Sequence, residues 1–358
     1  MSFYFTFIII SLFFFKLACK AYDTNKIVFS ICYAFAILIP AILGGYRDLS
    51  VGIDVLVYGE SMFDYAKSCS SISELIDDAS TREYGYFLLN YVCAKFSPDL
   101  HFFFFISELI KYGLISIVAL HFRGRLNSTI FVFSYIVLFY FSGLCLMRQG
   151  LAMSICFFAL IFLEKNKIVY LLLILVAWMF HSSAFIMVMF IFLDFLKKRS
   201  LSLYLNVAIL LVLYVFSTAL LVLLGGSGLV KENIADRYID TGVATSKAEI
   251  LIAICVLMYT FLKRKYLQKS SKYVLQTTTI YCLFFLFMST QFEVAARVAS
   301  YQMIVLLLYV PFSFNELLKK DRVRCYVIWS ALFFIHFYVS CQHGLSGTIP
   351  YTSKILGL

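Results

Sequence analysis

Charged residues are scarce in this sequence: Asp, Glu, Lys and Arg make up 14% of its 358 residues, whereas apolar residues make up 62%. This composition excludes a soluble globular protein, because no globule has enough interior to hide that much hydrocarbon. The solvent around most of the chain must therefore be lipid.

Motifs of the easily recognised soluble enzymes are also missing. The sequence has no Walker loop, no dinucleotide fingerprint, no Gly-x-Ser-x-Gly string and no His-Glu-x-x-His string. Its ten cysteines are scattered without the spacing of a metal site, so we interpret them as small packing residues. We expect neither a metal ion nor a cofactor.

Basic residues gather in alternate loops of the chain. Segments 16–26, 123–125, 164–167, 194–199, 263–272 and 316–324 together hold 19 Lys and Arg against 5 Asp and Glu. Carboxylates outnumber basic residues in the loops between them, so the positive-inside rule places the first set in the cytoplasm. The formal net charge of +10 therefore sets topology and attracts anionic membrane lipid, and we exclude nucleic acid as a partner.

The apolar runs predict an all-α polytopic membrane protein of about twelve transmembrane helices (11 to 13), with both termini outside. The whole chain, 1–358, is expected to form a single transmembrane domain with outer loops at 46–83 and 225–249. The predicted spans are residues 2–19, 27–45, 101–121, 127–146, 149–164, 168–181, 182–196, 201–224, 247–262, 274–290, 297–318 and 325–341.

Two stretches do not fit regular spans. Residues 84–96 are predicted to form a re-entrant or interfacial helix, because only an odd number of crossings connects the acidic outer loop to the basic loop at 123–125. Residues 168–195 must cross twice with legs of only about 14 residues each. The turn at His181-Ser182-Ser183 is therefore predicted to lie below the outer surface, beside a water-filled periplasmic cavity.

Four basic or titratable groups lie at the predicted outer helix ends: Arg47, Arg148, His181 and Arg297. Guanidinium groups are bidentate donors to phosphate oxygens and stay charged in a partly dry site, so several of them together suit a pyrophosphate. Arg148 has no adjacent carboxylate in the sequence, which favours a functional role.

Each of the other three has a structural alternative. Arg47 could pair with Asp48, Arg297 could pair with Glu293 one turn earlier, and His181 could hydrogen bond to Ser183 within its turn.

Several carboxylates likewise have both a structural and a functional interpretation. Glu108 and Lys111 lie three residues apart in a predicted span, so we expect a structural ion pair. Two further pairs could bind sugar hydroxyls or accept a proton, or could be solvated surface: Asp54 with Tyr58, and Glu83 with Tyr86.

Taken in order, six strings of the sequence resemble the EpsG-like branch of the Wzy-type polysaccharide polymerases. The strings are Arg47-Asp48 with Gly52, Asp54 and Tyr58; Glu83-Tyr84-Gly85-Tyr86; Met147-Arg148-Gln149-Gly150-Leu151-Ala152; Phe180-His181-Ser182-Ser183-Ala184; Arg297 with Tyr301; and Pro350-Tyr351. The resemblance implies a bacterial inner-membrane glycosyltransferase with an architecture like that of the GT-C group. It implies the joining of undecaprenyl-diphosphate-linked oligosaccharide repeats on the periplasmic side, in an O-antigen (lipopolysaccharide), capsule or exopolysaccharide pathway. A flippase and a chain-length regulator are the further partners that it suggests.

The resemblance also suggests roles for the candidate residues. Arg148 and Arg297, with Arg47, would bind the diphosphate, and His181, or failing it Asp54 or Glu83, would take the proton of the acceptor. The expected substrate-binding residues are Arg47, Asp48, Asp54, Tyr58, Glu83, Tyr86, Gln149 and Tyr301. An O-antigen ligase or other lipid-linked-sugar transferase, and a lipid-linked oligosaccharide flippase, are the alternatives that the residues leave open.

Overall fold

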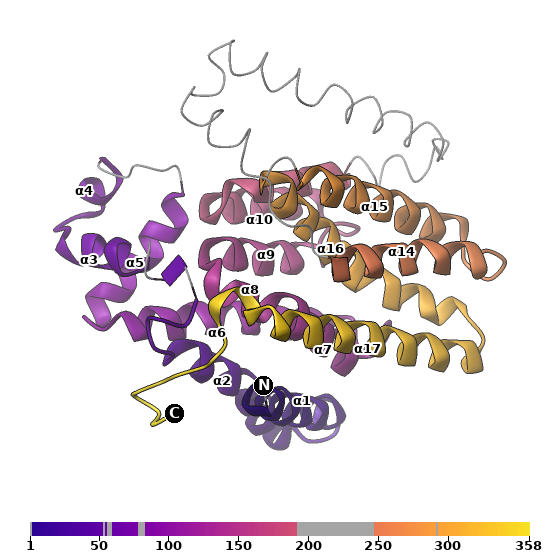
Figure 1. Ribbon diagram of the computed structural model, residues 1–358, viewed down its shortest axis with the longest axis horizontal. Helices are drawn as coiled ribbons and strands as arrows, with labels where there is room; N and C mark the ends of the chain where they lie inside the picture. The colour runs from indigo at the N-terminus through magenta and orange to yellow at the C-terminus, as the bar shows by residue number, and fades with distance from the viewer. Residues whose placement is uncertain (1, 53, 56–58, 78–82, 192–246, 291–292) are drawn as a thin grey trace, which may run out of the picture. The chain divides into compact units, whose positions relative to one another are not determined.

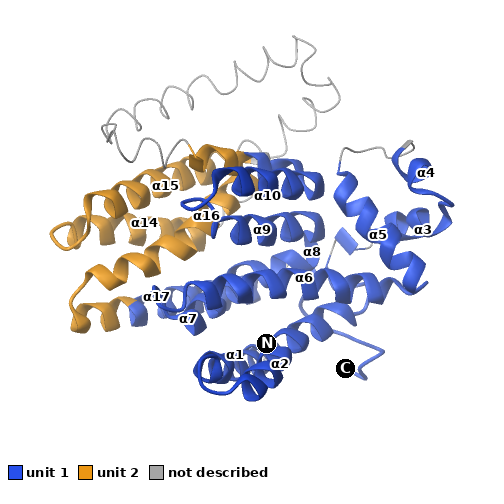
Figure 2. Cartoon of the chain, turned by 180° about the vertical axis from the view of Figure 1, so that it is seen from behind, with its two compact units in different colours: residues 1–185, 326–358 blue, residues 186–325 orange. Residues whose placement is uncertain are grey.

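The computed structural model describes residues 2–52, 54–55, 59–77, 83–191, 247–290 and 293–358. All regular elements in these residues are helical, and fourteen of them are α-helices (Figure 1). The chain divides into two compact units, each described here by itself (Figure 2): residues 1–185 with 326–358 form unit 1, and residues 186–325 form unit 2. The prediction of an all-α protein is confirmed.

The long helices of unit 1 begin at sequence signals that can be read directly. They are α1 (Ser2–Ala21), α2 (Lys26–Gly45) and α6 (Leu100–His121), followed by α7 (Ser128–Tyr135), which continues through a π-helical turn (Ile136–Tyr140) into α8 (Phe141–Cys145). Asn25 Oδ1 accepts hydrogen bonds from the N–H groups of Ile27 and Val28, and Asn127 caps α7 in the same manner. Asparagine at these positions satisfies amide groups that have no partner within the helix.

Six helices in the described residues are long and apolar enough to cross a membrane. They are Phe3–Ala21, Lys26–Gly45, Leu100–His121, Ser128–Cys145, Ala295–Glu316 and Lys319–Gln342. These helices indicate a multi-pass membrane protein, while the predicted number of about twelve crossings stays a prediction. The expected span 201–224 and residues 225–246 of the second outer loop lie outside the described residues.

Shorter helices follow the break after α8. They are α9 (Met147–Ala159) and α10 (Lys167–Phe180), and after His181 the chain enters a 3₁₀-helix (Ser182–Val188). Helix α9 packs against both α6 and α10, and Figure 1 shows α9 and α10 side by side. The 14 residues of α10 match the predicted short leg before the turn at His181.

Three short helices gather at one end of unit 1: α3 (Glu60–Ser68), α4 (Ile72–Asp77) and α5 (Tyr84–Phe96). Helix α5 packs against α3, α4, α6 and α10. Its core contacts come from aromatic rings, with Tyr86 5.4 Å from Phe103 in an edge-on arrangement. The bounds of α5 equal the residues 84–96 that were singled out as an irregular helix.

Unit 2 contains α14 (Lys247–Leu262), α15 (Lys269–Met288), α16 (Glu293–Ser313) and the first residues of α17 (Lys319–Gln342). Helix α15 packs against both α14 and α16. Lys263 Nζ lies 2.8 Å from Asp321 Oδ2, which joins the end of α14 to the start of α17.

The segment after α17 returns to the start of unit 1. The hydroxyl of Tyr4 in α1 donates to the carbonyl of Thr348 at 2.5 Å, and the hydroxyl of Tyr351 donates to the carbonyl of Leu43 in α2 at 2.9 Å. Residues 348–353 are thereby fastened to the first two helices.

Candidate functional site

Glu83 and Arg148 form an ion pair within unit 1. Glu83 directly precedes α5, and Arg148 lies in the first turn of α9. Nη1 of Arg148 donates to Oε2 of Glu83 at 2.5 Å, and the two side chains remain 25% and 12% exposed, respectively. The pair is therefore accessible. Arg148 has no carboxylate beside it in the sequence, and its partner Glu83 lies 65 residues earlier in the chain.

His181 lies next to this pair, directly after α10. Its Nε2 is 3.9 Å from Oε1 of Glu83, and its side chain is 10% exposed. The N–H of Ser183 donates to Nδ1 at 3.3 Å, and the Ser183 hydroxyl lies 2.6 Å from the same nitrogen. His181 therefore contacts Ser183 within its turn and also lies near the Glu83 carboxylate. We call Glu83, Arg148 and His181 the accessible cluster.

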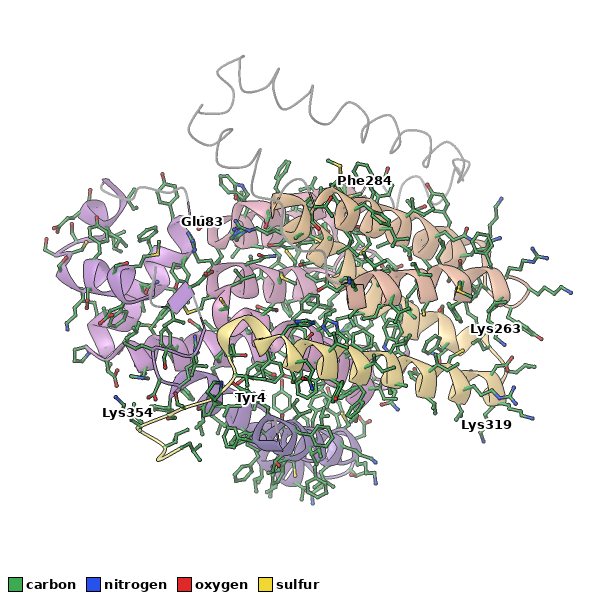
Figure 3. All side chains as sticks on the ribbon, viewed as in Figure 1. Tyr4, Glu83, Lys263, Phe284, Lys319 and Lys354 are labelled. Atoms are coloured by element: carbon green, nitrogen blue, oxygen red, sulfur yellow. The ribbon has the colours of Figure 1, made fainter. Side chains whose placement is uncertain are left out.

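A glycine allows the elements of the accessible cluster to meet. A Cβ at Gly85 would lie 3.1 Å from the Cβ, carbonyl carbon and carbonyl oxygen of Met179, which is closer than nearly all real contacts of this kind. The start of α5 therefore packs directly on the last turn of α10, where a larger residue would push the two helices apart. Figure 3 shows the labelled Glu83 where the start of α5 faces α10.

Two buried cations hold the helix break that comes just before α9. Leu146 has φ −82° and ψ 62°, outside the helical region, so α8 ends there. Lys111 Nζ donates to the carbonyl of Gly143 and Arg47 Nη2 donates to the carbonyl of Leu144, each at 2.9 Å. Carbonyls at the end of a helix need such partners, and cations are favourable there.

Glu108 and Lys111 form the structural pair that the sequence predicted. Lys111 Nζ lies 2.6 Å from Glu108 Oε1, and both residues are at most 2% exposed. We call Arg47, Glu108 and Lys111 the buried cluster.

Arg47 binds the protein's own backbone. It is fully buried, with Nε donating to the carbonyl of Val51 at 3.2 Å, Nη1 donating to the carbonyl of Gly44, and the guanidinium 4.4 Å from the centre of the Phe104 ring. The expected alternative, an ion pair with Asp48, is wrong, because the hydrogen bonds of Arg47 go to carbonyls and to a methionine sulfur. These contacts support a structural role.

The other candidates of the first outer loop have different partners or lie outside the described residues. Asp48 Oδ1 accepts a hydrogen bond from the backbone N–H of Lys354 at 2.9 Å, and this bond holds the pKa of Asp48 below its ordinary value. The N–H of Asp54 donates to Sγ of Cys145 at 3.5 Å. Tyr58 lies outside the described residues.

Tyr86 and Gln149, two of the predicted substrate-binding residues, are buried beside members of the accessible cluster in the sequence, and their role stays a prediction. Tyr86 is 1% exposed, and burial raises the pKa of its hydroxyl to about 12. Gln149 follows Arg148 in α9 and is 4% exposed.

Arg297 and Tyr301 belong to α16 of unit 2. Tyr301 is fully buried and Arg297 is half-buried. The side chain of Glu293, the alternative partner of Arg297, is outside the described part of the structure. The convergence of Arg297 with Arg148 stays a prediction.

Comparison with known proteins identifies the family to which the chain belongs. A model of the EpsG family matches residues 30–353, which is most of the chain. The chain belongs to the EpsG family. The family is associated with exopolysaccharide synthesis, and the matched range contains all members of both clusters. No curated protein and no solved structure matches the chain.

Some features of this EpsG-family site were not predicted from the sequence. The pairing of Glu83 with Arg148 was missed, as were the hydrogen bonds of Arg47 and Lys111 to helix-end carbonyls. The sequence contained one signal for the Glu83–Arg148 pair. Gly85, inside the Glu-Tyr-Gly-Tyr string, marks a place where two backbones approach closely.

Proposed function

We propose that this EpsG-family protein is a polysaccharide polymerase. It joins undecaprenyl-diphosphate-linked oligosaccharide repeats by glycosyl transfer on the periplasmic face of the bacterial inner membrane. Its reaction partners are two lipid-linked saccharides, and its working partners in the membrane are a flippase that delivers the repeats and a regulator of chain length.

The accessible cluster is the observation that carries this proposal. A partly exposed guanidinium and carboxylate lie together with a nearly buried imidazole, at the ends of helices that the loop charges assign to the outer side. The guanidinium suits a diphosphate oxygen, and the other two groups suit proton transfer. The buried cluster offers no such opening.

The reaction requires little beyond positioning and cations. A hydroxyl of one repeat attacks the anomeric carbon of the other saccharide, and undecaprenyl diphosphate leaves. Arg148 binds the departing diphosphate where negative charge accumulates, because a cation there stabilises the transition state more than the ground state. A carboxylate or imidazole of the accessible cluster takes the proton of the hydroxyl.

Arg297 is proposed as the second cation of the diphosphate site. It is half-buried on α16 and carries a group of the same chemistry. The remaining carboxylates and tyrosines of residues 46–83 are proposed to bind sugar hydroxyls.

Replacement of Arg148 by alanine tests the proposal. The Arg148→Ala protein, produced in a strain that lacks the native copy, is expected to leave single repeats on the carrier and to make no long chains. Removal of one such donor costs about 10²–10³-fold in rate. A blot of surface polysaccharide together with a protein blot for expression measures both quantities.

Arg123→Ala is the matched control. Arg123 is also ion-paired, with Nη2 3.1 Å from Asp23, but it follows α6 in a loop assigned to the cytoplasm. Its variant is expected to keep normal chain ladders. Normal ladders from well-expressed Arg148→Ala protein would contradict the proposal.

The same strains separate the alternative functions. Loss of a polymerase leaves carrier-linked single repeats exposed on the outer face, whereas loss of a flippase leaves them on the inner face. Loss of a ligase leaves long chains on the carrier that are not transferred to their final acceptor.

A further inference from the structure

We propose that donor binding activates the base of this site by ligand exchange. In the free protein Arg148 binds Glu83; the incoming diphosphate takes Arg148, and the released Glu83 carboxylate accepts the proton of the attacking hydroxyl. The inference rests on the proposed function and specifies its base and its order of events.

The geometry of the pair supports exchange. Arg148 reaches Glu83 through one nitrogen, Nη1 at 2.5 Å, and a quarter of its side chain is exposed. A diphosphate offers more charge and a bidentate arrangement to the same guanidinium, so it competes well with a single carboxylate oxygen. The first turn of α9 adds a favourable helix dipole for an anion at that place.

The same pair keeps Glu83 inactive until the donor arrives. Oε2 of Glu83 accepts a short hydrogen bond from Arg148, so this oxygen is not open to the hydroxyl of an acceptor. When Arg148 turns to the diphosphate, that oxygen becomes available. Arg148 therefore links the base, Glu83, to the site of the leaving diphosphate. Glu83 becomes available only when the lipid-linked donor saccharide is bound.

His181 is then a positioning residue. Because Nδ1 accepts the hydrogen bond from the N–H of Ser183, the neutral ring carries its proton on Nε2, the nitrogen 3.9 Å from Glu83. A nitrogen that carries a proton cannot accept another. It can donate to the freed carboxylate and hold it in place.

The chemical step balances without a further reactant. The acceptor oxygen forms a bond to the anomeric carbon of the donor, and its proton passes to the Glu83 carboxylate. The bond from the anomeric carbon to the diphosphate oxygen breaks, and its electron pair leaves on undecaprenyl diphosphate, which Arg148 binds. Glu83 loses its proton to water before the next cycle.

Diphosphate binding to the purified full-length protein in nanodiscs tests the exchange, with farnesyl diphosphate as the probe. Glu83→Gln removes a carboxylate that competes with the diphosphate for Arg148 and is expected to bind the probe about threefold tighter or more, while making no polysaccharide chains. Glu74→Gln is the matched control for charge, because Glu74, in α4, accepts hydrogen bonds from Ser70 and does not bind Arg148. Its affinity for the probe is expected to stay within about twofold of the original protein.

The outcomes distinguish this inference from the function on which it rests. Equal or weaker binding by Glu83→Gln overturns the exchange, and long chains from that variant overturn the base. Arg148→Ala is expected to lose affinity for the probe, and if it binds as tightly as the original protein, the diphosphate site itself is wrong. Should Glu83→Gln not fold, Glu83→Asp serves instead: its shorter side chain pairs less well with Arg148, so tighter probe binding supports the exchange and weaker binding overturns it.

Discussion

The two clusters of unit 1 contain the same kinds of charged groups but differ in their partners. In the buried cluster, the cations of Arg47 and Lys111 donate to main-chain carbonyls that the helix break leaves open. In the accessible cluster, Arg148 donates to the side chain of Glu83, and both side chains are partly exposed. Lys111 also binds the side chain of Glu108, but that pair is buried, whereas the Glu83–Arg148 pair is partly exposed. Burial and partner choice therefore separate structural charges from those able to meet a substrate.

The largest effect is expected from Lys111→Met. It leaves Glu108 buried without its cation and the carbonyl of Gly143 without this donor, which costs about 3–5 kcal/mol of folding free energy. Thermal unfolding of the purified protein in detergent measures this loss. The double variant Lys111→Met with Glu108→Leu removes both charges and is expected to regain most of the stability. A single variant as stable as the original would show that the buried pair is not structural.

Gly85→Ala is expected to disturb the accessible cluster more than the fold. The added Cβ forces α5 away from Met179 at a cost of about 1–3 kcal/mol, and the shift of Glu83 lowers chain synthesis roughly tenfold or more. Chain ladders and thermal unfolding are compared in the same preparation. Gly113→Ala is the control, because a Cβ at Gly113 meets no atom within 4 Å. Equal activity of the two variants would argue against the close approach as a requirement.

Ser183→Ala is expected to have a smaller effect, concentrated in activity. It removes a hydroxyl 2.6 Å from Nδ1 of His181 but keeps the backbone N–H that defines the tautomer. The loss of one such hydrogen bond costs about 0.5–1.5 kcal/mol, so chain synthesis should fall several-fold with little change in unfolding temperature. Ser182→Ala, one residue earlier, is the control. A drop in stability without a drop in synthesis would assign Ser183 to the fold.

The smallest effect concerns Asp48, the neighbour of the buried Arg47. The hydrogen bond from Lys354 lowers the pKa of Asp48, so its contribution to local stability is present above the ordinary carboxyl pKa and is lost as pH falls through the lowered folded value. Asp48→Asn should therefore speed proteolysis of residues 348–358 at neutral pH. The difference from the original protein should vanish in acid. Rates of limited proteolysis at a series of pH values measure this, and a difference that is independent of pH would rule out the ionised carboxylate as the cause.

Local features of the fold could be predicted from the sequence. The bounds of α2, α5 and α6 follow from apolar runs and from the capping residues Asn25 and Asp99. The Glu108–Lys111 pair and the Ser183 contact of His181 were also foreseeable, because each joins residues within one turn of the chain. Neighbouring residues determine such contacts, so a single sequence contains the necessary information.

Contacts over long sequence distances could not be predicted in this way. The sequence offered Asp48 as the partner of Arg47, yet burial turned the guanidinium to carbonyls of α2 and α8. Likewise Glu83 reaches Arg148 only because α5, α9 and α10 come together. Which helices pack together depends on the whole chain, and local patterns do not specify it.

The division of unit 1 between two stretches of chain has a consequence for biosynthesis. Residues 326–358 belong to unit 1 but are translated after all of unit 2. Tyr4 and Leu43 thus receive their hydrogen-bond partners, Thr348 and Tyr351, only when more than 300 further residues have left the ribosome. The first two helices therefore lack these hydrogen bonds during synthesis until the closing segment arrives.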